Sequence, residues 1–222
     1  MTVPVAGVAG VAERFAVVRA RIERAGGDGS VGVVAVTKTF GLDAVRAAGL
    51  VGCAAIGENY AQELVGKLLD QADLPPVHFI GQLQTNKVRL VAPYVQVYET
   101  IDRDSLAADV ARRAPGATVL VQVITSGDPG KGGCAVAGVA RLVDRCSGLG
   151  LRPIGLMTVG PTDVDEDETR AGFRVVRALV DELGLSVCSM GMSDDLELAV
   201  QEGSTQVRIG SALFGARPPR TR

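Results

Sequence analysis

Lys38 lies near the end of an apolar segment, VVAVTKTF (33–40), whose other residues are typical of a buried strand. Arg208 lies in a second such segment, QVRIG (206–210), near the other end of the chain. Burial and a neighbouring cation both lower the pKa of a lysine. The resulting neutral amine attacks carbonyl carbons and forms imines. We therefore interpret Lys38 as a candidate nucleophile, provided that the fold brings Arg208 close to it.

The segment SMGMSDDLELAV (189–200) has the residue types of an anion site. It offers the hydroxyl of Ser189, then a conformationally permissive glycine, then an expected helix start in which Asp194 and Glu197 have capping-box spacing. Such a helix start presents backbone N–H groups that attract phosphate.

A second helix start is expected in RIGSALFGA (208–216), where Gly210 and Ser211 precede a short apolar run. Two helix starts that face each other form a phosphate cradle. The alternative is that Gly210 and Ser211 only cap a terminal helix. The cradle is favoured if both segments follow the last two strands of a barrel, because barrel phosphate sites are frequently built there.

Strand-like and helix-like segments alternate along the chain. The candidate strands are 31–38, 53–57, 76–81, 95–100, 118–125, 151–158, 185–190 and 205–210. Strands rich in Val and Ile and separated by helices are parallel and buried on both faces. About eight such units predict a closed (β/α)₈ TIM barrel. The alternative is an open doubly wound sheet, but no G-x-G-x-x-G turn follows the first strand.

One domain is expected over residues 1–222, with a helix within residues 1–28 packed on the barrel. Within the strands, side chains alternate between the two faces. This alternation places Val36 and Lys38 on one face of the first strand, and directs Arg208 toward the barrel interior. Both cations are then expected in one cavity at the carboxyl ends of the strands.

The composition favours a small ligand. The 222 residues carry a net charge of −2, so neither nucleic acid nor an anionic membrane is an expected partner. The chain has four scattered cysteines and one histidine, which indicates neither disulfides nor a metal site and favours buried cysteines. The sequence has neither a signal-peptide pattern nor a long apolar span, so a cytoplasmic protein is expected.

A nucleophilic lysine opposite a phosphate cradle describes a pocket for a phosphorylated aldehyde, and pyridoxal 5'-phosphate (PLP) fits that description. The chain also resembles the YggS/PROSC family of pyridoxal phosphate homeostasis proteins, from about residue 31 to residue 217. The motifs that carry the resemblance are VVAVTKTF, IGENYAQEL, HFIGQLQTNKVR, IDR, GLMTV and SMGMSDDLELAVQEGSTQVRIGSALFGAR.

The resemblance implies a barrel like the N-terminal domain of alanine racemase. It implies PLP held as an imine on the side-chain nitrogen of Lys38, and a contact from Arg208 to the pyridine nitrogen. It further implies phosphate contacts from Ser189, Gly210 and Ser211. The motifs that border the site add Asn59, Asn86 and Met157.

Three other segments carry weaker signals. The segment QVITSGDPGKGGC (122–134) departs from the family pattern, so its role is left open. The acidic run DVDEDETR (163–170) is expected to begin a helix rather than to bind a cation. His78 is expected to be a packed residue at a strand end rather than a general base.

Two functions are compatible with this pocket. One is a non-catalytic, monomeric protein that stores PLP or delivers it to apo-enzymes. The other is a PLP-dependent racemase, which needs a second base opposite Lys38. In alanine racemase-like enzymes a tyrosine from a further β domain supplies that base, and the sequence has no expected counterpart of this domain. The carrier is therefore the favoured hypothesis.

Overall fold

The computed structural model describes residues 7–125, 132–161 and 165–216. Its strands are β1 (Gly32–Val36), β2 (Ala55–Glu58), β3 (Val77–Phe79), β4 (Val97–Ile101), β5 (Thr118–Ile124), β6 (Cys134–Ala135), β7 (Arg152–Thr158), β8 (Val187–Ser189) and β9 (Gln206–Ile209). Its α-helices are α1 (Val8–Arg24), α2 (Leu42–Leu50), α3 (Ala61–Leu68), α4 (Val88–Val91), α5 (Asp104–Arg113), α6 (Val139–Gly148), α7 (Glu166–Glu182), α8 (Leu196–Gln201) and α9 (Ser211–Phe214). Two short 3₁₀ turns are η1 (Thr85–Lys87) and η2 (Val136–Gly138).

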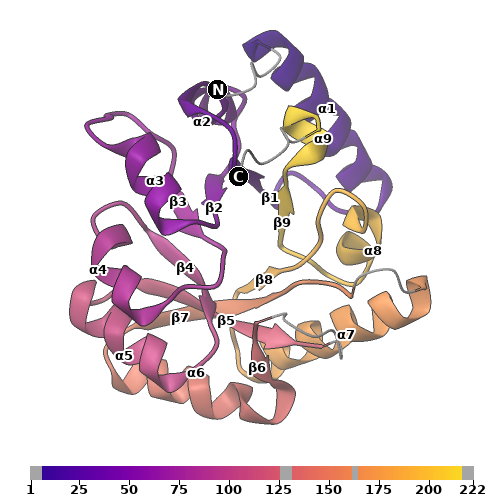
Figure 1. Ribbon diagram of the computed structural model, residues 1–222. Helices are drawn as coiled ribbons and strands as arrows, with labels where there is room; N and C mark the ends of the chain where they lie inside the picture. Colours follow the sequence, from indigo (N-terminus) through magenta and orange to yellow (C-terminus); the bar gives the residue numbers. More distant parts are fainter. Residues whose placement is uncertain (1–6, 126–131, 162–164, 217–222) are drawn as a thin grey trace.

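The strands form one parallel sheet in the order β4-β3-β2-β1-β9-β8-β7-β5-β6. An additional pairing between β4 and β5 closes this sheet into a barrel, and the helices surround it (Figure 1). The predicted (β/α)₈ barrel is therefore confirmed, and each of the eight predicted strands is present. The two-residue strand β6, which pairs with the end of β5, was not predicted. It follows residues 126–131 of the QVITSGDPGKGGC segment, which lie outside the described residues.

Alternation along the strands separates two layers. On β1, Val33 and Ala35 belong to the apolar layer between the strands and the helices. Val34 is buried but lies on the opposite face of the strand, outside this layer. Its Cγ1 packs against Gly57 of β2, where an added Cβ would lie 3.1 Å away. The same alternation on β9 places Val207 in the apolar layer. The outer face of the barrel is thus covered by apolar contacts with the helices, as is usual for a parallel sheet.

The barrel interior contains a group of buried polar side chains. They include Glu99, Thr100, Gln122, Ser189 and Arg208. On β4 the pairing register with β5 shifts between Tyr98 and Ile101. Both of these residues belong to the apolar layer, and two residues lie between them, where regular alternation would leave one. Both of the intervening residues, Glu99 and Thr100, make hydrogen bonds to interior side chains. The register shift thereby brings a carboxylate into the barrel.

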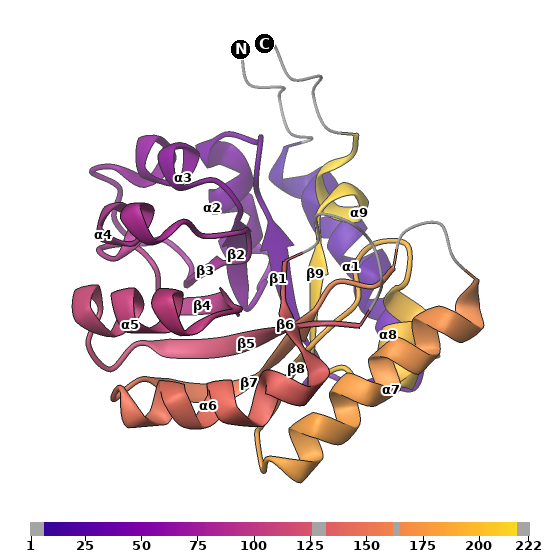
Figure 2. The same ribbon diagram turned by 60° about the horizontal axis from the view of Figure 1, so that its bottom comes forward.

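The first helix packs on the last part of the chain. Figures 1 and 2 show α1 beside α8 and α9, and residues of α1 contact residues of both. Its buried face carries Val11, Val18 and Ile22. The acidic run behaves as predicted where it is described: Asp165 caps α7 by accepting the N–H of Glu168 at 2.9 Å.

The described residues contain no helix that is long and apolar enough to cross a membrane. They also contain no group of three or more His, Cys, Asp or Glu side chains that could hold a metal ion. The cysteines Cys53, Cys146 and Cys188 are buried as expected, whereas Cys134 is half-buried.

Candidate functional site

A cavity of about 400 Å³ opens at the carboxyl ends of the barrel strands. Its walls come from β1 and β9 and from the segments that follow β1, β2, β3, β7, β8 and β9. The lining residues are Val36, Lys38, Asn59, Ile80, Val159, Met192, Ser193, Asp194, Arg208, Gly210 and Ser211. Because the functional sites of (β/α)₈ barrels lie at this end, the cavity is the candidate functional site.

Lys38 lines the cavity from the turn that follows β1. The predicted strand included Lys38, but β1 ends at Val36. The reason is that the carbonyl oxygen of Thr37 accepts the N–H of Phe40 at 3.0 Å, which closes a turn. Lys38 is half-buried, and Val36 lines the same cavity. The side chain therefore reaches the cavity from a turn rather than from the strand.

Arg208 reaches the same cavity from the interior face of β9, and only 4% of its surface is exposed. Its Nη1 donates hydrogen bonds to the carbonyl and hydroxyl oxygens of Ser189, both at 2.8 Å. Its Nη2 donates to the carbonyl oxygen of Thr158 at 2.6 Å. Burial lowers the pKa of this guanidinium, and the nearby carboxylate of Glu99 acts in the opposite direction. The contacts fix the plane of the guanidinium, since two of its nitrogens are held from different strands.

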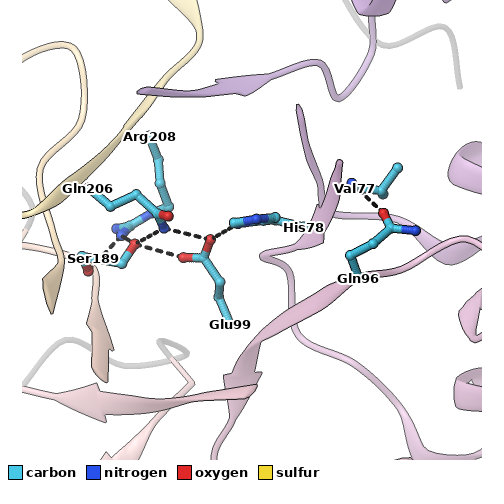
Figure 3. A network of polar contacts seen from close by, with 7 residues as sticks. All are labelled: Val77, His78, Gln96, Glu99, Ser189, Gln206 and Arg208. Atoms are coloured by element: carbon cyan, nitrogen blue, oxygen red, sulfur yellow. Dashed lines mark hydrogen bonds and ion pairs between the residues drawn. The ribbon is translucent and has the colours of Figure 1, made fainter. Parts of the chain in front are cut away.

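A group of buried polar contacts centres on Glu99 (Figure 3): three side chains bond to it directly, and Arg208 joins the group through Ser189. Oε1 of Glu99 lies 2.5 Å from Nδ1 of His78 and accepts a hydrogen bond from Nε2 of Gln206 at 2.8 Å. Its Oε2 accepts the hydroxyl of Ser189 at 2.7 Å. Burial raises the pKa of Glu99, but His78, the charge of Arg208 and the Ser189 hydroxyl outweigh it, so the pKa lies below the ordinary 4.5. We call these five residues the Glu99 network.

The segments that follow β8 and β9 meet at the cavity wall. Gly210 is the N-cap of α9, and Ser211 is its first residue. The hydroxyl oxygen of Ser193, in the segment after β8, accepts the N–H of Ala212 at 3.3 Å. The two segments that were predicted to form an anion site are therefore adjacent, and both contribute residues to the cavity.

The capping box predicted for Asp194 and Glu197 is wrong. The helix α8 begins at Leu196, its N-cap is Asp195, and no side chain caps it. Glu197 instead forms a two-pronged ion pair with Arg21 of α1, at 2.6 and 2.7 Å. A bidentate arginine–carboxylate pair is stronger than a hydrogen bond to a backbone N–H, so the contact with α1 prevails.

Asn59 lines the cavity from the segment between β2 and α3. Its backbone is crowded by Gly81, where an added Cβ would lie 2.2 Å from the carbonyl oxygen of Asn59. Only glycine permits this close approach. The side-chain Oδ1 of Asn59 is buried and has no hydrogen-bond partner among the described residues. A buried acceptor of this kind is suited to a donor from a ligand or an ordered water.

The comparisons with known proteins agree with this geometry. The family described as alanine racemase, N-terminal domain, matches residues 10–218. A pyridoxal phosphate homeostasis protein of Pseudomonas aeruginosa is 42% identical, over 93% of this chain and 96% of its own length. The protein of the same name from Schizosaccharomyces pombe is 36% identical, over 90% of both chains. This chain belongs to the pyridoxal phosphate homeostasis protein family.

Solved structures also resemble this family member. The structure of PipY from Synechococcus elongatus with PLP bound superposes with a TM-score of 0.78 at 31% identity, over 92% of this chain and 100% of that one. Lysine decarboxylase from Selenomonas ruminantium superposes with a TM-score of 0.68 at 18% identity, over 94% of this chain and 61% of that one. The second likeness shows the shared barrel fold alone.

Five of the predicted site residues line the cavity of this family member: Lys38, Asn59, Arg208, Gly210 and Ser211. Three others do not. Ser189 and Met157 are fully buried and lie in register on neighbouring strands, with the Ser189 hydroxyl already engaged by Glu99 and Arg208. Asn86 is exposed in η1.

Sequence reasoning missed the Glu99 network and part of the cavity lining, notably Met192 and Ser193. The alternation that directed Arg208 inward also directed Gln206 inward, and Gln206 donates to Glu99. An inward arginine requires a buried acceptor or a counter-charge, so an acidic residue in another strand could have been sought. Only the three-dimensional arrangement identifies it as Glu99.

Proposed function

We propose that this chain binds PLP in the cavity at the carboxyl ends of the strands, with a covalent bond to Nζ of Lys38, and carries the cofactor without catalytic turnover. The observation that carries the proposal is the shared cavity. Lys38 lies near one end of the sequence and Arg208 and Ser211 near the other, yet all three line one space of about 400 Å³. That volume lies in the range of small-molecule sites, about 300–1,000 Å³.

The residue types fit the chemical groups of PLP. An aldehyde requires an amine, which Lys38 provides. A phosphate requires N–H and hydroxyl donors, which the start of α9 offers at Gly210 and Ser211. The pyridine nitrogen accepts hydrogen bonds, and the guanidinium of Arg208 has only donors. The buried, unpartnered Oδ1 of Asn59 leaves one acceptor for a donor of the ligand.

Lys38 acts as the nucleophile in this proposal. Its neutral amine attacks the aldehyde carbon, a C=N double bond forms, and the aldehyde oxygen leaves as water. The reaction needs no oxidant or reductant. Release reverses the same steps by adding water, or a competing amine, at the same carbon. A carrier requires this reversibility.

Arg208 provides the main argument against turnover. PLP, when bound, can act as an electron sink for carbanions, and does so best when its ring nitrogen is protonated. A guanidinium donates hydrogen bonds and offers no proton acceptor. Held by Ser189 and Thr158, Arg208 disfavours protonation of a ring nitrogen placed against it.

The residues outside the cavity have indirect roles in this proposal. Ser189 acts through Arg208 and Glu99 rather than on the phosphate, because its hydroxyl is already bonded to both. Met157 fills the barrel beside it. For the exposed Asn86 we propose no direct contact. We further propose that the protein is a cytoplasmic monomer whose recipients are PLP-dependent apo-enzymes.

A transfer experiment tests this function. Protein loaded with PLP and freed of excess cofactor is mixed with a PLP-requiring apo-enzyme, whose activity is then followed. We expect the wild-type protein to activate the enzyme, whereas Lys38→Ala retains no cofactor through the same preparation. Lys87→Ala, which alters a lysine outside the cavity, serves as the matched control and should transfer as the wild type does. Failure of wild-type protein to retain PLP would contradict the proposal.

A further inference from the structure

The backbone on both sides of Lys38 is held by charged side chains of α3 and β2. On α3, Glu63 and Lys67 lie one turn apart and form an ion pair at 3.0 Å. Nζ of Lys67 also donates to the carbonyl oxygen of Thr37 at 2.8 Å and to Oε1 of Glu58 at 2.6 Å. These three acceptors match the three N–H donors of an ammonium. The residue that precedes Lys38 is therefore fixed through its carbonyl oxygen.

The residue that follows Lys38 is fixed through its N–H. Oε1 of Glu63 accepts the backbone N–H of Thr39 at 2.5 Å. Thr39 has a φ of 70°, in the left-handed region that β-branched residues rarely adopt. Such a conformation persists only where neighbouring contacts hold it. The contact with Glu63 supplies that constraint, and Lys38 lies between the two anchored residues.

The arrangement is buried, which distinguishes it from ordinary surface ion pairs. The side chain of Lys67 is 6% exposed and that of Glu58 is not exposed at all. Glu58 also accepts the hydroxyl of Thr37 at 2.6 Å. Burial raises the pKa of Glu58, although Lys67 and Thr37 oppose this. Buried charges are weak evidence for stability, so a role in placing the adjoining segment accounts better for them.

We propose that Glu58, Glu63 and Lys67, which we call the Lys38 clamp, are positioning residues that fix the turn bearing Lys38 so that its amine meets the bound aldehyde. The inference rests on the proposed function of Lys38. It assigns to α3 a role in the rate of covalent capture rather than in recognition of the phosphate or the ring. None of the three clamp residues is among those that line the cavity.

The test separates capture from binding. Capture is followed as the rate at which the visible absorbance of the PLP imine appears after mixing. Binding is followed with pyridoxine 5'-phosphate, in which an alcohol replaces the aldehyde, so that it occupies the pocket without reacting. The variants are Glu63→Leu and the double variant Glu58→Gln/Lys67→Met, which removes the two buried charges together and leaves Glu63 bonded to the backbone N–H of Thr39. Arg177→Met, which breaks an exposed ion pair with Asp181 one turn away on α7, is the matched control.

We expect both clamp variants to capture PLP about tenfold or more slowly, because small misplacements of reacting groups cost up to about 10²-fold in rate. Their affinity for pyridoxine 5'-phosphate should stay within about twofold of the wild type, as an intact pocket requires. Arg177→Met should change neither quantity. Capture at the wild-type rate in folded Glu63→Leu would overturn the clamp, and so would an equal loss of capture and binding, which indicates general damage to the site.

The outcomes distinguish the clamp from the function on which it rests. If wild-type protein forms no imine on Lys38, the proposed function fails and the clamp fails with it. If the wild type reacts and the clamp variants react equally fast, only the clamp fails. Should the double variant not fold, Glu63→Leu decides alone, since Glu63 is 27% exposed and its replacement leaves the buried pair in place.

Discussion

The hydroxyl of Ser189 donates a hydrogen bond to Oε2 of Glu99 at 2.7 Å, across the interior of the barrel. The two residues lie on β8 and β4, which are not neighbours in the sheet. The same hydroxyl oxygen accepts from Arg208 at 2.8 Å. Ser189 therefore connects a buried carboxylate with the buried guanidinium that lines the cavity.

Replacing Ser189 by alanine tests this connection. We expect Ser189→Ala to lower the free energy of unfolding by about 1–3 kcal/mol, because Glu99 loses a donor and Arg208 loses an acceptor, both in a buried site. Urea denaturation measures the change. Ser186→Ala is the control, since this serine near the start of β8 is exposed and its hydroxyl donates to the carbonyl of Ile154. Its effect should stay within about 0.5 kcal/mol. Equal effects of the two substitutions would refute the bridging role.

Replacing Arg208 by lysine keeps a cation but loses the planar fork. The guanidinium donates to Ser189 and to Thr158 from two separate nitrogens. The ammonium of lysine has one nitrogen and does not reproduce this arrangement. We expect Arg208→Lys to reduce the free energy of unfolding by about 1–3 kcal/mol, with one buried carbonyl left unbonded. Affinity for pyridoxine 5'-phosphate should fall as well. A variant as stable as the wild type would show that charge alone suffices.

The lowered pKa of Glu99 predicts that the stability of the fold depends on pH. The pKa of this carboxyl is lowered in the folded protein from the ordinary 4.5. Its ionised form therefore stabilises the fold above about pH 4.5, and this contribution is lost as the pH falls through the lower folded pKa. Glu58, whose pKa is raised by burial, has the opposite sign: its contribution is present below its unfolded pKa and is lost as the pH rises through its folded pKa.

Comparing the wild type with Glu99→Gln isolates Glu99, because Glu58 is present in both proteins. The difference in unfolding free energy between them should be largest near neutral pH and should shrink in acid, below about pH 4.5. Urea titrations at a series of pH values measure it. A difference that is constant over the whole range would mean that Glu99 titrates alike in the folded and unfolded chains.

If the protein is a carrier, it should not accelerate exchange of the α-protons of amino acids. In heavy water, a panel of amino acids incubated with PLP-loaded protein should exchange its α-protons no faster than with free PLP at the same concentration. The physical reason is that Arg208 disfavours the protonated ring that stabilises a carbanion. Nuclear magnetic resonance follows the exchange directly. Rapid exchange of one amino acid would favour a racemase-type enzyme instead.

The fold follows from the sequence to a large extent because its signals are local. Apolar runs such as that of β5 (Thr118–Ile124) and the alternation on β9 are readable without knowing the partner strands. The end of β1 was misplaced because a turn bond between Thr37 and Phe40 overrides an apolar pattern that continues past it. The strand β6 is too short, at two residues, to produce a pattern at all.

The candidate site was also predictable only where its signals are local in the sequence. Lys38, Arg208, Gly210 and Ser211 could be predicted, since their positions at strand ends and helix starts are local properties. The partners of Ser189 could not, because they depend on which strands face each other across the barrel. The capping box of Glu197 failed for a related reason: Arg21 lies 176 residues away in the sequence and competes for the carboxylate.

The central claim is that Lys38 holds PLP covalently, and the chain allows a direct test because it has only four lysines, at positions 38, 67, 87 and 131. PLP-loaded protein is reduced with borohydride, digested, and mapped by mass spectrometry. We predict that the added mass lies on the peptide that contains Lys38, and that it is absent from Lys38→Ala. An adduct on Lys87, which lines a smaller neighbouring cavity that also includes Asn59, or no adduct at all, would contradict the claim.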